Sequence, residues 1–117
     1  MPISWNEISN RARKFSKEFE GDSRETAESQ TFWNSFFDIF GISRRRVASF
    51  EAPTKYASGA PGEIDLLWRG KLLVEQKSRG KSLIRARKEA FEYFPGIKEK
   101  DLPQYVLVCD FEKFNLL

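Results

Sequence analysis

Histidine is absent from this chain of 117 residues, and cysteine occurs once, as Cys109. Without histidine the chain lacks the commonest general base and a common metal ligand, and it cannot form a Ser-His or Cys-His dyad. A single cysteine excludes an internal disulfide and a thiolate-rich zinc site, and it suits a reducing compartment. An enzyme with this sequence would therefore rely on carboxylates, lysine and a hard metal ion.

Long apolar runs are missing as well. No stretch approaches the roughly 20 apolar residues that span a bilayer, and the first residues lack the apolar core of a signal peptide. We therefore expect a cytoplasmic protein without a membrane partner. There is no internal repeat and no low-complexity tract. The composition, 40% hydrophobic and 32% charged, is typical of one folded domain.

Helical periodicity predicts two amphipathic helices, over residues 5–19 and 24–40. Ser4 and Glu7 form a capping box before the first helix, and Gly41 closes the second. A third helix is expected over residues 83–94, after Ser82 as its cap. The predicted buried positions are Trp5, Ile8, Ala12, Phe15, Phe19, Phe32, Trp33, Phe36, Phe37, Phe40, Leu83, Ala86, Ala90 and Phe94.

Apolar segments between turn residues predict the strands. They span residues 47–51, 63–68, 71–78 and 105–109, with a loop at 53–62. Residues 111–117 read as a turn and the start of another strand, so we expect a domain of a longer polypeptide. The order ααβββαβ indicates an α/β protein with a mixed central sheet flanked by helices.

Charged residues interrupt the central hairpin. Asp65 precedes Glu75 by ten residues, and Gln76 and Lys77 follow directly. The neighbouring positions are Ile64, Leu66, Leu67, Leu72, Leu73 and Val74. Burying charge in such surroundings costs several kcal/mol unless the group is paired or holds a metal.

The hairpin register decides whether these groups meet. A two-residue turn at Arg69 and Gly70 would pair Leu67 with Leu72 and Val74 with Asp65, so that Asp65 faces away from Glu75. A three-residue loop of Trp68, Arg69 and Gly70, with Gly70 left-handed, would pair Leu67 with Lys71, Asp65 with Leu73 and Glu63 with Glu75. Asp65 and Glu75 would then be diagonal neighbours on one face, with Lys77 beside them.

Two carboxylates and a lysine without histidine suit hydrolysis of a phosphodiester. The carboxylates would hold Mg²⁺, which lowers the pKa of a bound water and neutralises charge on the phosphate. Lys77 would position that water or stabilise the transition state. Structural ion pairs within the hairpin are the alternative interpretation of the same residues.

This pattern resembles the PD-(D/E)XK nuclease motif, whose common core is helix, three strands, helix, strand. The sequence around the motif is similar to the amino-terminal nuclease domain of MmeI-like restriction-modification enzymes. The similar segments run from Gly62 to Trp68, from Leu73 to Ser78 and from Tyr105 to Asp110. The likeness covers roughly residues 23–117. Members of that family join this domain to a DNA adenine methyltransferase and a target-recognition domain in one chain.

The resemblance implies Asp65 and Glu75 as metal ligands, the Gln76 carbonyl as a further ligand, and Lys77 as the catalytic lysine. The family often adds an acid from the preceding helix. Glu25 is the better candidate there, since it lies in the middle of the apolar stripe whereas Glu28 falls towards its edge. A first-turn acid that favours the helix dipole is an equally good explanation of Glu25.

Two departures from the family pattern concern the residue before Asp65 and the following helix. Ile64 stands where a proline is frequent, and this variation is tolerated. Many relatives carry Gln-x-x-x-Tyr on the helix after the motif, whereas this sequence has Glu89 and Tyr93. Two interpretations of that helix remain: it contacts the scissile strand, or Glu89 simply faces solvent.

Basic residues follow the motif without an intervening acid. Arg79, Lys81 and Arg85 are the candidates for contact with the DNA backbone, because phosphates are bound by such side chains. Arg87 and Lys88 are better explained as a solvated helix face. The cluster 44–46, on an expected loop, is a further candidate.

The sequence therefore predicts a Mg²⁺-dependent endonuclease domain acting on double-stranded DNA, with Mn²⁺ as an alternative ion. Specificity would come from the methyltransferase and target-recognition domains of the longer chain, where S-adenosylmethionine would also bind, and dimerisation for cleavage stays open. The alternative is a catalytically inactive nucleic-acid-binding or scaffolding module with the same fold.

Overall fold

The computed structural model describes residues 3–21 and 25–117, and the side chains of residues 25–27 lie outside that description. Within these residues a five-stranded sheet is combined with four α-helices and two short 3-10 helices. The helices are α1 (Trp5–Glu18), α2 (Glu25–Ile39), α3 (Arg44–Val47), α4 (Leu83–Glu92), η1 (Phe94–Gly96) and η2 (Glu99–Asp101). The strands are β1 (Ser49–Lys55), β2 (Pro61–Trp68), β3 (Leu72–Gln76), β4 (Tyr105–Cys109) and β5 (Phe114–Leu116).

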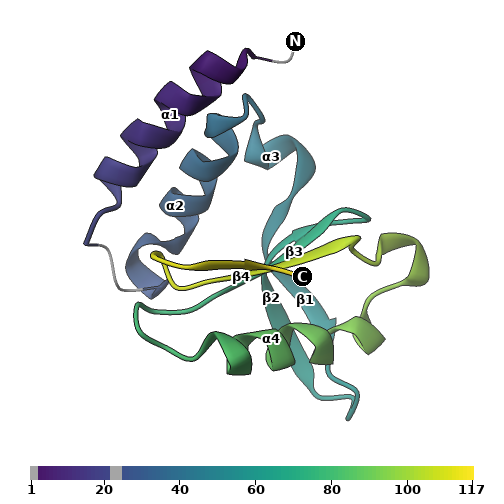
Figure 1. The fold of residues 1–117 in the computed structure, drawn as a ribbon. Helices are drawn as coiled ribbons and strands as arrows, with labels where there is room; N and C mark the ends of the chain where they lie inside the picture. Colours follow the sequence, from purple (N-terminus) through teal and green to yellow (C-terminus); the bar gives the residue numbers. More distant parts are fainter. Residues whose placement is uncertain (1–2, 22–24) are drawn as a thin grey trace.

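The strands lie side by side in chain order, from β1 to β5. Neighbours are antiparallel except β3 and β4, which are parallel. A parallel pair needs a crossover connection, and α4 with the two 3-10 helices supplies it. Figure 1 shows α4 on one side of the sheet and α2 on the other, with α1 lying along α2. The expected α/β architecture with a mixed sheet and flanking helices is confirmed, and the strand expected within residues 111–117 is β5.

Two apolar clusters, one on each face, fix the helices on the sheet. On the α2 face, Phe32, Trp33 and Phe37 pack against Leu66 and Val74. The cluster on the α4 face contains Ala52, Ile64, Leu67, Leu73, Ala86, Ala90, Tyr93, Val106 and Val108. Because both faces are covered, β3 and β4 carry almost continuous apolar side chains.

The local signals at helix ends were correctly interpreted from the sequence. The Ser4 hydroxyl accepts the N–H of Glu7 at 3.1 Å, and the Ser82 hydroxyl accepts the N–H of Arg85 at 3.2 Å. Gly41 follows α2 with φ +73°, the left-handed conformation that ends many helices. α4 ends two residues earlier than expected, because the chain passes into η1 at Phe94.

Two of the aromatic residues expected in the core are exposed. Trp5 is 81% exposed and Phe40 is 42% exposed. Both lie near the outer ends of their helices, and α1 packs on α2 rather than on the sheet, so its apolar stripe has a partner on one side only. Helical periodicity identified the stripe but overestimated its length.

The first strand was wrongly placed. Residues 44–47, expected as a basic cluster leading into a strand, form the short helix α3, and β1 begins at Ser49 and continues to Lys55. Pro53 does not interrupt β1, although a loop was expected there. Pro53 pairs with Glu63 of β2. Because β1 is an edge strand, the N–H that proline lacks is not needed for a second neighbouring strand.

Both expected registers of the β2–β3 hairpin are wrong. The pairs are Leu66 with Val74, Leu67 with Leu73 and Trp68 with Leu72, so the loop is Arg69, Gly70 and Lys71. Gly70 is left-handed, as expected, with φ +76°.

The segment before β4 explains this register. The carbonyl of Lys71 accepts the N–H groups of Gln104 and Tyr105, both at 3.0 Å, and Gly70 N–H donates to the Asp101 carbonyl. These bonds keep Lys71 in the loop. Continuing the observed register by one pair places Asp65 opposite Glu75 rather than diagonal to it.

β1 and β2 reverse their faces at the same level of the sheet. Phe50 and Leu66 belong to the α2 face, whereas Ala52 and Ile64, two residues away, belong to the α4 face. Residues two apart in a regular strand share a face, so each strand turns over at the residue between them. In β1 this residue is Glu51, with φ +51°, and in β2 it is Asp65.

No helix in the described part of the chain combines the length and apolar character needed to cross a membrane.

Candidate active site

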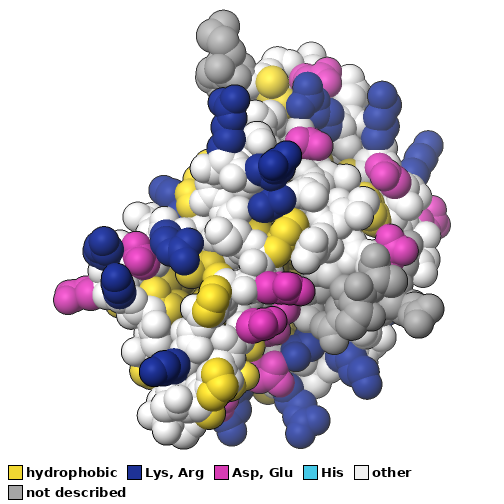
Figure 2. Space-filling view, turned by 180° about the vertical axis from the view of Figure 1, so that it is seen from behind, with side chains coloured by type: hydrophobic (Ala, Val, Ile, Leu, Met, Phe, Trp, Pro, Cys, Tyr) yellow, Lys and Arg dark blue, Asp and Glu magenta, His cyan; other side chains and the backbone are white. Residues whose placement is uncertain are grey.

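A cleft of about 710 Å³ opens where β1, β2 and β3 meet the ends of α2 and α4. Its lining combines polar residues of α2 with the charged residues of the hairpin: Ser29, Gln30, Thr31, Glu51, Asp65, Glu75, Gln76, Lys77, Glu89 and Tyr93. Seen from behind, acidic side chains gather on the face of the molecule between the helices α1 and α2 above and α4 below (Figure 2).

Asp65 reaches across to the end of β3. Its Oδ2 accepts the backbone N–H of Gln76 at 2.7 Å, and the residue is half-buried. This bond replaces a backbone ladder contact, because the ladder between β2 and β3 stops at Leu66 and Val74. The reversal of β2 at Asp65 thus lets its side chain leave both apolar faces and line the cleft.

Glu75 is almost completely buried, with 4% of its side chain exposed. Its Oε2 accepts no hydrogen bond from any described residue. Burial, followed by the neighbouring Asp65 carboxylate, raises the pKa of Glu75 to about 9. A buried carboxylate oxygen without a donor is costly in free energy, so this group is poised to take a proton or a cation.

The side chain of Gln76 is engaged by α2 and by the neighbouring backbone. Its Oε1 accepts the indole N–H of Trp33 at 2.8 Å, and its amide donates to the Lys77 carbonyl at 2.9 Å. The backbone N–H of Gln76 faces Asp65, and the ligand role expected for its carbonyl stays a prediction.

Lys77 lies between two carboxylates. Its Nζ is 2.6 Å from Oε2 of Glu89 and 3.9 Å from Oε1 of Glu75, and 21% of its side chain is exposed. Glu89 lines the cleft and pairs with Lys77, while 42% of its side chain stays exposed, so it is more than a solvated side chain on α4. The backbone N–H of Lys77 donates to the Cys109 carbonyl at 2.8 Å, which extends the contact between β3 and β4.

Tyr93 lies one helical turn beyond Glu89, where α4 ends. It is 5% exposed and its ring centroid lies 5.3 Å from that of Tyr56. Burial, and then the charge of Glu75, raise the pKa of Tyr93 above its usual range. Its hydroxyl therefore stays protonated and is a hydrogen-bond donor at the cleft wall.

Glu51 was missed as a site residue. It lines the cleft from β1, opposite Asp65 in the β1–β2 register, and it is exposed. A non-glycine residue in the left-handed region is uncommon within a strand and often marks a functional position. The sequence signal was weak, since an acid at a strand edge is usually a solvated side chain.

The lining of the cleft is strongly acidic. Among the described lining residues there are four acids, Glu51, Asp65, Glu75 and Glu89, and one basic residue, Lys77. Within the described residues no group of three or more His, Cys, Asp or Glu side chains is arranged as a metal site. The arrangement fits a hard ion held by Asp65 and Glu75 with water in its other positions, which is how Mg²⁺ usually binds. The Oε2 of Glu75, which has no partner among the described residues, would be one ligand atom of such an ion.

The acid expected from the preceding helix cannot be placed. The side chain of Glu25 lies outside the described residues, although its backbone begins α2. Glu28 is half-buried on α2 and is not among the residues that line the cleft.

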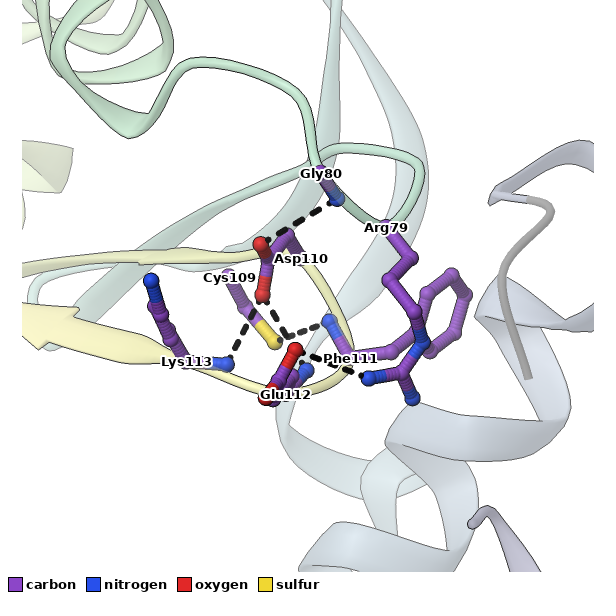
Figure 3. Close-up of polar contacts among 7 residues, drawn as sticks. All are labelled: Arg79, Gly80, Cys109, Asp110, Phe111, Glu112 and Lys113. Atoms are coloured by element: carbon purple, nitrogen blue, oxygen red, sulfur yellow. Dashed lines mark hydrogen bonds and ion pairs between the residues drawn. The ribbon is translucent and has the colours of Figure 1, made fainter. Parts of the chain in front are cut away.

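The basic loop after the motif is held by a turn at the end of β4. Asp110 is 4% exposed, and its carboxylate accepts the N–H groups of Lys113 at 2.8 Å, Glu112 at 3.1 Å and Gly80 at 3.4 Å (Figure 3). Arg79 pairs with Glu112 at 3.1 Å. The Asp110 turn therefore fixes the path of the loop between β3 and α4.

The three candidate DNA contacts differ in their surroundings. Arg79 is 30% exposed and engaged by Glu112, whereas Lys81 and Arg85 are exposed. In the basic cluster, Arg44 lies over the Phe50 ring at 4.1 Å and bonds to Asn34, while Arg45 and Arg46 are exposed. The structure thus gives Arg79 and Arg44 structural contacts that the sequence did not indicate.

The family described as "MmeI, N-terminal domain" matches residues 10–117 of the chain. No curated protein and no solved structure matches the chain.

Proposed function

The chain belongs to the family of MmeI N-terminal domains, a region of restriction-modification enzymes, and from the geometry of its cleft we propose that it is a Mg²⁺-dependent DNA endonuclease domain. The proposal includes a PD-(D/E)XK core for the mixed sheet and its flanking helices. The observation that carries it is the buried, unpartnered Oε2 of Glu75 beside Asp65, with the Lys77 ammonium in the same cleft.

Asp65, Glu75 and the backbone carbonyl of Gln76 would hold the ion, with Glu25 as a further acid from α2. When bound, Mg²⁺ lowers the pKa of a coordinated water and neutralises charge on the phosphate. Mn²⁺ has a similar preference for oxygen ligands and can replace it. Asp65 is already oriented by the Gln76 N–H, so little side-chain ordering remains for binding.

Lys77 acts on the substrate side of this site. Its ammonium lies between Glu75 and Glu89 in the cleft, where it would bind a non-bridging phosphate oxygen and stabilise the charge that grows there. The Tyr93 hydroxyl, held protonated by burial and by the charge of Glu75, lies at the wall of the same cleft. These roles need no histidine, in agreement with the composition.

DNA approaches along the loop and helix that follow the motif. Lys81 and Arg85 are exposed there and would contact backbone phosphates, with Arg79 behind them in its pair with Glu112. Such contacts attract any DNA sequence equally. Target recognition is therefore assigned to the methyltransferase and target-recognition domains of a longer cytoplasmic protein, which would also bind S-adenosylmethionine.

The test is a plasmid assay on this chain, with Mg²⁺ or Mn²⁺ and with EDTA. We expect metal-dependent nicking in the wild type, its loss in Lys77→Ala, and its retention in Lys98→Ala, an exposed lysine before η2. Direct titration with Mn²⁺ should show binding that Asp65→Asn and Glu75→Gln abolish.

Two results would contradict the proposal. Nicking that persists equally in Lys77→Ala or in EDTA would assign the activity to another site or a contaminant. DNA binding without Mn²⁺ binding at Asp65 and Glu75 would instead support the inactive nucleic-acid-binding module.

A further inference from the structure

Among the described residues, two carboxylates lie near the Lys77 ammonium, and the closer contact is with Glu89, the one more distant in sequence. Nζ lies 2.6 Å from Glu89 Oε2, within hydrogen-bond distance, but 3.9 Å from Glu75 Oε1. Glu75 precedes Lys77 by two residues and is the acid nearest to it in the sequence. Only the shorter contact, to Glu89, is a charge-assisted hydrogen bond.

Helix α4, which carries Glu89, is fixed at three places. Ala86 and Ala90 have no exposed surface, so the helix lies close against the sheet. Ser82 caps its first turn, and Tyr93, one turn after Glu89, is buried beside Tyr56. The Glu89 carboxylate is therefore carried by a rigid element rather than by a loop.

We propose that Glu89 is a positioning residue that holds the Lys77 ammonium away from Glu75, so that the Glu75 carboxylate stays available to a divalent cation. This inference rests on the proposed function of the cleft. Without Glu89, the ammonium can swing onto Glu75, donate to its unpartnered Oε2 and compete with the cation for the same oxygen. Glu89 thus protects the cation site without touching the cation.

The experiment measures Mn²⁺ binding to the whole chain, by electron paramagnetic resonance of the free ion. Glu89→Ala should weaken binding about tenfold, at the lower end of the loss that follows removal of a residue behind the metal ligands. Glu89→Gln keeps an acceptor for Lys77 without its charge, so an intermediate loss is expected. Glu92→Ala, an exposed acid at the end of α4, should leave the dissociation constant unchanged.

The decisive comparison repeats Glu89→Ala in a Lys77→Met background. If Glu89 acts through Lys77, removing Glu89 no longer weakens Mn²⁺ binding once the ammonium is gone. An equal loss in both backgrounds would overturn the inference, because Glu89 would then attract or bind the cation directly. Thermal unfolding of each variant shows whether it remains folded at the temperature of the titration.

The outcomes separate this inference from the function on which it rests. A wild type that binds no Mn²⁺ in the cleft overturns the proposed function, and the role of Glu89 with it. A wild type that binds Mn²⁺ at Asp65 and Glu75, with Glu89→Ala indistinguishable from Glu92→Ala, overturns the role of Glu89 alone.

Discussion

The indole N–H of Trp33 donates a 2.8 Å hydrogen bond to Oε1 of Gln76, and both side chains are at most 1% exposed. The bond ties the middle of α2 to the last residue of β3. Because Gln76 N–H also holds Asp65, the same residue joins the core to the cleft. The position of α2 over the site therefore depends on a buried polar contact within an aromatic cluster.

Trp33→Phe should destabilise the protein by about 1–3 kcal/mol, since it leaves Oε1 of Gln76 buried without a donor. Urea unfolding followed by circular dichroism measures the change in the free energy of unfolding. The matched control is Trp5→Phe, at a position 81% exposed, where less than about 0.5 kcal/mol is expected. Equal effects at both positions would contradict the role of the bond.

Glu75→Gln should stabilise the metal-free protein at pH 8 and have little effect at pH 4.5. The folded pKa of Glu75 is raised to about 9 from an ordinary value of 4.5, so between these values the folded state holds a proton that the unfolded state releases. The free energy of unfolding therefore falls as the pH rises through this window. Glutamine carries no such proton and removes the dependence.

Thermal unfolding in EDTA at the two pH values tests this, with Glu63→Gln as the control. Glu63 is an exposed acid on the same strand as Asp65. A melting temperature raised by Glu75→Gln to the same extent at pH 4.5 and pH 8 would contradict the prediction.

Asp110→Ala should destabilise the protein by about 1–3 kcal/mol, because the N–H groups of Gly80, Glu112 and Lys113 lose a common acceptor. Burial raises the pKa of Asp110, but these bonds outweigh it and the net pKa is lowered. The contribution is thus present at neutral pH and is lost as the pH falls.

Hydrogen exchange should also show faster exchange at Gly80 in Asp110→Ala, since the loop after β3 loses its attachment. Asp38→Ala, at an exposed position on α2, is the control and should change neither stability nor exchange at Gly80. Unchanged protection of Gly80 in Asp110→Ala would show that the carboxylate does not hold the loop.

The Cys109 thiol should be inert in the folded protein. Its side chain is buried, and burial raises the pKa of the thiol to about 12, so almost no thiolate exists at pH 8. Reaction with Ellman's reagent should therefore be at least about a hundredfold slower in the native protein than in guanidinium chloride. Rapid reaction of the native protein would contradict this and show that the end of β4 opens to solvent.

Local signals in the sequence predicted the helices and their caps well. The Ser4 and Ser82 caps and the Gly41 terminator act through backbone groups within a few residues, so a short stretch of sequence contains the whole interaction. The buried strand 105–109 was likewise evident from its unbroken apolar run. The candidate site was predicted by the same means, from charges placed among apolar strand residues, and the cleft brings Asp65, Glu75 and Lys77 together.

The details of the site could not be obtained in this way. The hairpin register follows from hydrogen bonds between Lys71 and the segment before β4, more than thirty residues away. The pairing of Lys77 with Glu89 needs the packing of α4 on the sheet, and the cleft position of Glu51 needs the reversal of β1. None of these contacts has a signature in the neighbouring residues.

By itself, the sequence determined which residues could perform chemistry here: with no histidine, Asp65, Glu75 and Lys77 were the groups whose burial required an explanation. Only the tertiary structure decided how these groups are arranged, which carboxylate holds the lysine, and which oxygen is left without a partner. The physical reason is that the cost of burying a charge can be recognised from its neighbours in the chain, whereas its partner is chosen by elements that folding brings together from distant positions.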